Sequence, residues 1–172
     1  MKTKHIIVEP YNEMWENEFQ KIKTEIEHTL GNLCVEIYHI GSTSVKGLSA
    51  KPIIDIDVVI EDYSSFPDVI RKLNSIGYIH EGNLGIKDRE AFKYNNKPHL
   101  QQHHLYVCPK NSEELHRHIV FRDYLRAHPE AVKKYSEIKE NAAKLYPNSI
   151  EKYMEYKNSC IAELYLLCGL NT

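Results

Sequence analysis

The stretch HIGSTSVKGLSAKPIIDIDVVIED, residues 39–62, constrains the fold more than any other part of the chain. A loop of small, hydroxyl-bearing residues comes directly before a β-branched run in which acidic and apolar residues alternate. β-Branched residues favour strands, and residues two apart on a strand point to the same face. Asp55 and Asp57 are therefore predicted to share one face of a strand over residues 52–60, whose other face is apolar.

The apolar periodicity of the whole chain predicts an α+β protein, in which a mixed sheet flanked by helices is followed by a helical C-terminal half. The predicted strands cover residues 5–8, 34–40, 52–60, 78–80, 86–94 and 101–108. The predicted helices cover residues 10–30, 64–76, 112–127, 129–145 and 148–168, the last with Asn148 as its N-cap. Gly and Asn separate the short strands after residue 77, which indicates antiparallel hairpins. No linker interrupts the pattern, so residues 1–172 are expected to form a single domain.

Charge and cysteine usage narrow the class of protein. The formal net charge is −2, which argues against a general nucleic-acid binder, because such proteins usually carry a strong basic excess. The four cysteines contain no C-x-x-C pair, so a disulfide framework is not expected and a reducing cytoplasm fits. No apolar run is long enough for a signal peptide or a membrane span. We therefore expect a cytoplasmic protein without a membrane partner.

The loop at residues 41–44, Gly-Ser-Thr-Ser, has the composition of a phosphate cradle. Gly41 allows close approach of the backbone to a ligand, and Ser42 and Ser44 add hydroxyl and N–H donors. An ordinary Ser/Thr turn has the same composition and is the alternative. The loop is not a Walker loop, because the G-x-x-x-x-G-K-[ST] spacing is absent.

The two acids that follow are candidate metal ligands. Two neighbouring carboxylates repel each other, and a bound divalent cation removes that repulsion. Mg²⁺ (or Mn²⁺) suits Asp55 and Asp57, because Mg²⁺ prefers one or two carboxylates completed by waters and substrate phosphates. A solvated sheet face with incidental acids is the alternative. In combination with the preceding loop, the pair predicts a phosphoryl- or nucleotidyl-transfer site with Asp55 and Asp57 as metal ligands and catalytic residues.

Three basic residues are candidates for binding the remaining phosphate charge. Arg122 and Arg126 lie four apart on a predicted helix that is apolar on most sides and is therefore expected to be buried. Each arginine then needs a partner, either a protein carboxylate or a ligand phosphate. Lys51 lies at the mouth of the acidic strand and has two interpretations, a surface lysine or a phosphate ligand.

The histidine-rich segment at residues 99–118 does not predict a zinc site. His103 and His104 face opposite sides of a strand, and His116 and His118 do not share a helix face. For most of the ten histidines, an ordinary hydrogen-bonded role is the prediction.

The stretch HIGSTSVKGLSAKPIIDIDV closely resembles the signature of the GrpB family, which belongs to the nucleotidyltransferase superfamily with the DNA polymerase beta-like fold. The resemblance extends along nearly the whole chain. It includes VEPYNEMWENEF at 8–19, HHLYV at 103–107, FRDYLRAHPEAVKKY at 121–135, and the pair Tyr153 and Lys157. Two positions depart from the family pattern: Lys46 replaces a proline, and Tyr106 replaces the second His of His-Leu-His-Val.

The resemblance implies a Gly-Ser signature, two acids on the next strand, and often a third acid on a later strand. The first two features match, but the later strand carries no acid, and the resemblance implies that His104 lines the cleft there. A missing third acid weakens the case for two-metal catalysis. A related domain is fused to dephospho-CoA kinase in some bacteria, which by analogy points to nucleotide or coenzyme A metabolism.

The main hypothesis is a nucleotidyltransferase-like protein that binds a nucleotide and Mg²⁺ and transfers a nucleotidyl group to a small-molecule acceptor. A second hypothesis is a non-catalytic module that binds a nucleotide or coenzyme-like ligand. A third is a metal-dependent phosphoester hydrolase, in which water is the acceptor.

Overall fold

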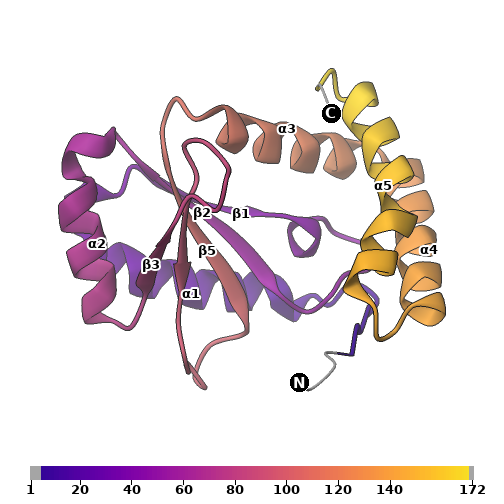
Figure 1. The fold of residues 1–172 in the computed structure, drawn as a ribbon, viewed down its shortest axis with the longest axis horizontal. Coiled ribbons are helices and arrows are strands. Elements are labelled where there is room, and N and C mark those ends of the chain that lie inside the picture. The colour runs from indigo at the N-terminus through magenta and orange to yellow at the C-terminus, as the bar shows by residue number, and fades with distance from the viewer. Residues whose placement is uncertain (1–4, 171–172) are drawn as a thin grey trace.

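A five-stranded mixed sheet forms the centre of the protein, which is described by a computed structural model over residues 5–170 (Figure 1). Its spatial order is β1-β2-β5-β4-β3. The strands are β1 (Glu36–Ile40), β2 (Ile54–Ile60), β3 (Ile79–Gly82), β4 (Glu90–Lys93) and β5 (His103–Pro109). β2 runs antiparallel to β1 and parallel to β5, and the remaining pairs are antiparallel.

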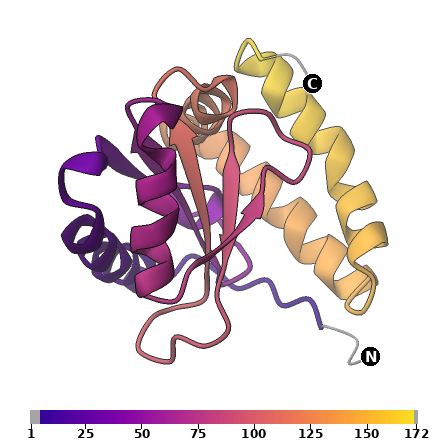
Figure 2. The same ribbon diagram turned by 60° about the vertical axis from the view of Figure 1, so that its left-hand side comes forward.

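Helices lie on both sides of this sheet. They are α1 (Met14–Leu30), α2 (Phe66–Ser75), α3 (Glu113–Ala127), α4 (Pro129–Leu145) and α5 (Ile150–Leu167). The apolar stripes of α1 and α2 pack on the face that carries Ile54, Ile56 and Val58, and together they form the main core. Figure 2 shows α1 and α2 on one side of the sheet and the α4–α5 pair on the other. The acidic face of β2 therefore points toward the C-terminal helices.

The predicted α+β class, with a mixed sheet and a helical C-terminal half, is confirmed. The predicted helix at 129–145 matches α4, and Ser112 caps α3 by accepting a hydrogen bond from the amide of Leu115. The Gly-Ser loop contains one short 3-10 turn, η2 (Ser42–Ser44). Within residues 5–170, no helix is both long and apolar enough to cross a bilayer.

Several predicted boundaries were wrong for local reasons. Residues 5–8 form no strand, because the amide of Ile6 donates to the carbonyl of Pro147 in a loop and the nearby bridge between Glu9 and Ala50 is isolated. The predicted strand at 86–94 shortens to β4, because the backbone at Leu84 and Asp88 is left-handed, with φ of 52° and 58°, and turns the chain before the strand begins.

Two expectations about the C-terminal helices were also wrong. Ser149, rather than Asn148, caps α5, and it accepts from the amide of Lys152. The side chain of Asn148 instead forms a hydrogen bond with His5. The sequence predicted a largely buried α3, but only Leu115 and Leu125 of this helix are buried. Its remaining apolar side chains are partly exposed at the edge of the fold.

Candidate functional site

Gly41 brings the Gly-Ser loop into direct contact with the first acid. Its backbone φ of +73° lies in a region that residues other than glycine rarely adopt. A Cβ atom at this position would lie 2.4 Å from Oδ2 of Asp55. The 3-10 turn that follows is closed by the amide and hydroxyl of Ser44, which both donate to the carbonyl of Gly41. Glycine is therefore required here both for backbone geometry and for the space that the carboxylate occupies.

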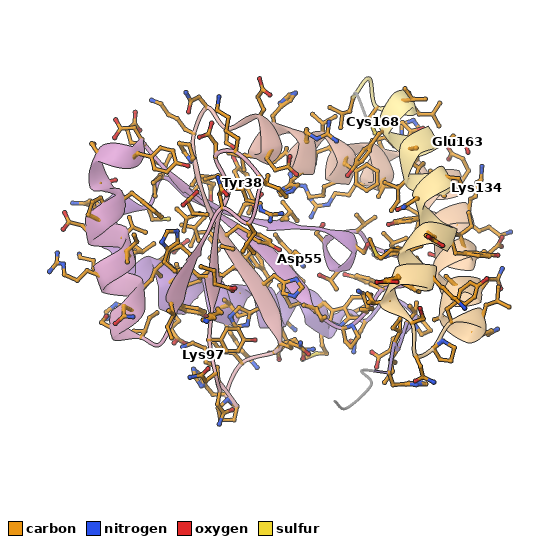
Figure 3. All side chains as sticks on the ribbon, in the orientation of Figure 1. Tyr38, Asp55, Lys97, Lys134, Glu163 and Cys168 are labelled. Carbon is orange, nitrogen blue, oxygen red and sulfur yellow. The ribbon has the colours of Figure 1, made fainter. Side chains whose placement is uncertain are left out.

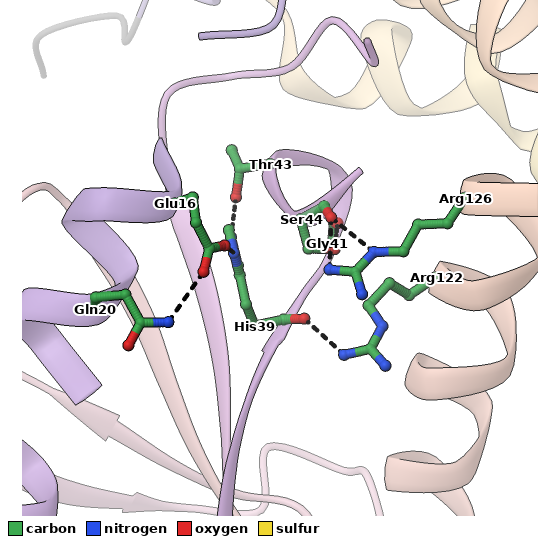
Figure 4. A network of polar contacts seen from close by, with 8 residues as sticks. All are labelled: Glu16, Gln20, His39, Gly41, Thr43, Ser44, Arg122 and Arg126. Atoms are coloured by element: carbon green, nitrogen blue, oxygen red, sulfur yellow. Dashed lines mark hydrogen bonds and ion pairs between the residues drawn. The ribbon is translucent and has the colours of Figure 1, made fainter. Parts of the chain in front are cut away.

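Two arginines of α3 donate to backbone carbonyls in and just before this loop (Figure 4). Arg126 donates from Nε and Nη2 to the carbonyl oxygen of Ser44, at 3.0 and 2.8 Å. Arg122 donates to the carbonyl of His39 at 3.2 Å and pairs with Asp123 at 2.9 Å. These arginines have backbone partners that the sequence did not indicate. A role for either of them in binding phosphate stays a prediction.

Replacing Arg126 with alanine is expected to loosen the loop. The carbonyl of Ser44 would lose both donors, and a hydrogen bond to a charged group contributes about 1.5–3 kcal/mol. We expect the free energy of unfolding, measured by urea denaturation, to fall by about 1–3 kcal/mol. Arg126→Lys should recover only part of it, because lysine cannot make the bidentate contact. Equal stability of Arg126→Ala and wild type would show that the contact does not hold the loop.

His39 supports the loop from the opposite side. Its ring stacks on Phe19 of α1, with centroids 4.7 Å apart, and Nε2 lies 2.8 Å from the hydroxyl of Thr43. Burial lowers the pKa of His39 to about 4. The ring is therefore neutral at pH 7 and belongs to the packing of the loop.

The two acids of β2 share a face but have different environments. The side chain of Asp55 is 30% exposed, and its Oδ1 accepts from Nδ1 of His104 at 2.9 Å. Asp57 is fully buried, and its Oδ2 accepts from Nδ1 of His118 at 2.6 Å. Its Oδ1 finds no hydrogen-bond partner anywhere in the described part of the chain. His104 is thus confirmed as a neighbour of the acid pair, whereas His118 is an addition.

His118 of α3 connects Asp57 to a third carboxylate. Its Nε2 lies 3.2 Å from Oε1 of Glu114, one turn earlier on the helix. Burial raises the pKa of Asp57, although the bond from His118 opposes the shift. Burial alone would lower the pKa of His118, but the hydrogen bond to Asp57 and the charges of Asp57 and Glu114 raise it. The net direction is upward, and both ring nitrogens of His118 lie within 3.2 Å of carboxylate oxygens.

The sequence did not predict this contact. His116 and His118 do not share a helix face, which excludes a zinc site formed by both of them. It does not exclude a contact made by either histidine alone. Contact between His118 and Asp57 spans 61 residues of sequence, and no local pattern indicates it.

Three lysines gather beside the Gly-Ser loop, and we call Lys51, Lys139 and Lys157 the lysine cluster. Lys139 of α4 is 3% exposed, and it donates to Oγ of Ser42 and to the carbonyl of Ser49. Lys157 of α5 is 7% exposed, with Nζ 4.6 Å from the ring centroid of Tyr153. Nζ of Lys51 lies 5.4 Å from the same ring.

The positive charge of Lys139 and Lys157 is poorly compensated among the described residues. Burial and, to a lesser extent, the charge of Lys51 lower the pKa of Lys157 to about 8, and only Asp55 opposes the shift. Burial, together with Lys157 and Lys51, holds the pKa of Lys139 well below its usual value. Neither Lys139 nor Lys157 pairs with any carboxylate within residues 5–170. Such an arrangement fits a multiply charged anion, because buried positive charge is costly without a partner.

A sequence signal for two of these lysines existed. Lys139 continues the helical stripe of Val132 and Tyr135, and Lys157 lies on the stripe of Tyr153 and Cys160. A lysine on the apolar face of a helix must be either paired or functional. The buried hydroxyl of Tyr153, whose ring lies beside Lys51 and Lys157, has no hydrogen-bond partner among the described residues.

The acid pair fits one divalent cation whose remaining ligands come from outside the protein. Oδ1 of Asp57 has no partner, and the half-exposed carboxylate of Asp55 shares its face. No group of three or more His, Cys, Asp or Glu side chains in residues 5–170 could hold a metal alone. On β5, His104 lies opposite Asp55 and Tyr106 opposite Asp57. Waters and ligand phosphates would therefore have to complete the coordination of Mg²⁺.

The mixed sheet, the Gly-Ser turn after β1 and the two acids on β2 define the nucleotidyltransferase-like fold class. A poly(U) polymerase, Cid1, whose structure was solved with MgATP, shares this fold with a TM-score of 0.53. The match covers 76% of this chain and 45% of that chain at 11% sequence identity, so it shows the fold alone.

The chain belongs to the GrpB family, because the family model described as "GrpB protein" matches residues 5–166. The crystal structure of conserved protein GrpB from Enterococcus faecalis matches with a TM-score of 0.83 and 32% identity, over 94% of this chain and 96% of that one. UPF0157 protein YqkA of Bacillus subtilis (strain 168) is 35% identical over 152 residues. That match covers 88% of this chain and 43% of YqkA, so the chain spans less than half the length of that relative.

Proposed function

We propose that this protein binds a nucleoside triphosphate together with Mg²⁺ or Mn²⁺ and transfers the nucleotidyl group to a hydroxyl of a small molecule. The observation that carries the proposal is the lysine cluster, which concentrates buried positive charge beside Ser42 and Asp55. A triphosphate supplies the negative charge that Lys139 and Lys157 lack among the described residues. The MgATP in the structure of Cid1 supports the same choice of ligand.

Each part of the site has a role in this reaction. The lysine cluster binds the β- and γ-phosphates, and the backbone N–H groups of Gly41 and Ser42 face the phosphate chain. The donors of Ser44 close the turn, so in this structure Ser44 shapes the phosphate site rather than donating to it. Asp55 and Asp57 hold the divalent cation, which when bound supplies charge neutralisation at the reacting phosphate. His104 orients the carboxylate of Asp55 through their hydrogen bond.

The transfer is an in-line displacement. The acceptor oxygen forms a bond to the α-phosphorus, and the bond from that phosphorus to the oxygen bridging to the β-phosphate breaks. Pyrophosphate leaves with the displaced electron pair, and the lysine cluster stabilises its charge. The proton of the acceptor hydroxyl passes to the carboxylate of Asp55 and from there to water.

A second candidate function is nucleotide or coenzyme binding without catalysis. The position opposite Asp57 on β5 carries Tyr106 rather than a third acid, and His118 already engages one oxygen of Asp57. This candidate predicts the same nucleotide binding with no product formed.

A thermal-shift panel tests the proposal. It compares ATP, GTP, CTP, UTP and coenzyme A precursors, each with and without Mg²⁺, on wild type and on Asp55→Asn. A ligand that binds only the folded state stabilises it by about 2.7 kcal/mol at one hundred times its Kd. We expect an Mg²⁺-dependent rise in Tm with at least one nucleotide, and its loss in Asp55→Asn. An absence of any rise would contradict nucleotide binding, and phosphate release without an added acceptor would favour hydrolysis.

A further inference from the structure

A polar groove of about 450 Å³ opens beside the acid pair, between the connection of β4 to β5 and the open half of the sheet. Its volume lies within the range of small-molecule sites. Its polar lining includes Glu81, Lys93, Asn95, Asn96, Gln102 and His104. His104 belongs to both places, because it lines the groove and donates to Asp55. A molecule in the groove therefore lies one side chain away from the first acid.

The groove and the lysine cluster lie on different sides of Asp55. Asp55, labelled in Figure 3, pairs on one side with His104 of β5, which lines the groove. On its other side it pairs with Ile40 of β1, which leads into the loop where Ser42 accepts from Lys139. In an in-line displacement, the attacking and leaving oxygens lie on opposite sides of the phosphorus. If the leaving pyrophosphate rests on the lysine cluster, as the proposed function requires, the acceptor approaches from the groove.

The lining of the groove indicates the chemistry of that acceptor. Asn95, Asn96 and Gln102 each offer an amide that both donates and accepts, which suits neighbouring hydroxyl groups. Glu81 and Lys93 contribute one charge of each sign, so they add no net charge. The ammonium of Lys97 is already engaged, since it donates to the carbonyl of Ile76 and lies 3.6 Å from a carboxylate oxygen of Glu25.

We propose that this groove binds the acceptor and that the acceptor is a neutral polyhydroxylated molecule of the sugar or cyclitol class. One of its hydroxyls faces Asp55, and transfer yields a nucleotidyl phosphodiester of the sugar together with pyrophosphate. This inference rests on the proposed function for its reaction but not for its binding site.

Amide NMR of the full chain tests the binding site, with methyl α-D-glucopyranoside and myo-inositol as probes. Saturable shifts are expected in the side-chain amides of Asn95, Asn96 and Gln102. Gln102→Leu removes one amide and is expected to weaken probe binding roughly fivefold, as the loss of one hydrogen bond would. Asn141→Leu, an equivalent change on the exposed face of α4, is the matched control and should bind the probe like wild type.

The outcomes separate this inference from the proposed function. An absence of saturable shifts with both probes, or an unchanged affinity in Gln102→Leu, would overturn the groove as the acceptor site. Tighter binding of glucosamine or glucose 6-phosphate would overturn the neutral class. ATP with Mg²⁺ is titrated into the same sample: failure of that titration alone refutes the proposed function, while loss of sugar binding alone refutes the groove.

Discussion

Lys157→Met is expected to make the folded protein more stable and its binding of a nucleoside triphosphate weaker. Lys157 is 7% exposed and pairs with no carboxylate of the described residues. Burial lowers its pKa from 10.5 to about 8, which corresponds to about 3 kcal/mol of unfavourable free energy in the folded state. Methionine has a similar length and no charge, so at pH 7 the free energy of unfolding should rise by up to about 3 kcal/mol.

The pH dependence of this gain identifies its cause. At pH 7, Lys157 is protonated in both the folded and the unfolded states, so the full cost of the buried charge is present. Between the folded pKa of about 8 and the unfolded value of 10.5, the unfolded state binds more protons, and the stability of wild type rises with pH. The advantage of Lys157→Met over wild type should therefore shrink through this window in urea denaturation. A variant that is less stable than wild type at pH 7 would contradict the interpretation.

The same substitution removes one charge from the lysine cluster. Charge-assisted contacts to phosphate contribute about 1.5–3 kcal/mol each, so affinity for the nucleotide should fall by about 10- to 100-fold. Lys152→Met is the matched control, because Lys152 is an exposed lysine of the same helix. Nucleotide affinity should be unchanged in that variant. A protein that gains stability while it loses ligand affinity is the expected behaviour of a site that stores uncompensated charge.

Gly41→Ala is expected to abolish Mg²⁺-dependent nucleotide binding and to destabilise the protein. The added Cβ would lie 2.4 Å from Oδ2 of Asp55, so the carboxylate or the loop must move. The φ of +73° adds backbone strain, and the free energy of unfolding should fall by about 1–3 kcal/mol.

Gly31→Ala is the control that separates the effect of backbone strain from the effect of the steric clash with Asp55. Gly31 also has a positive φ, +56°, but no atom lies within 4 Å of the position of its Cβ. Gly31→Ala should therefore lose stability and retain nucleotide binding, as measured by denaturation and by thermal shift with Mg²⁺. Retained binding in Gly41→Ala would show that the position of Asp55 does not matter to the ligand.

Local patterns were sufficient to predict the central part of the site. The alternation at residues 52–60 placed Asp55 and Asp57 on one face of β2, and the Gly-Ser composition predicted the turn that contacts them. Short-range periodicity carries this information, because strands and single turns are determined by neighbours two to four residues apart.

The remaining half of the site depends on contacts between distant segments. Lys139 reaches Ser42 across 97 residues, and His118 reaches Asp57 across 61. Such contacts follow from the packing of α3 beside β1 and of α4 and α5 against their neighbouring helices, which no short window encodes. The arginines of α3 show the same limit, since the sequence did not indicate that Arg126 donates to the backbone carbonyl of Ser44.

Calorimetric titration of a nucleoside triphosphate with Mg²⁺ tests the central claim most directly, because it measures the joint action of the acid pair and the lysine cluster. We predict saturable binding to wild type, at least about tenfold weaker binding to Lys157→Met, and loss of the Mg²⁺ dependence in Asp55→Asn. Equal affinity of all three proteins, or no heat with any nucleotide, would contradict the assignment of this site to a metal-bound polyphosphate.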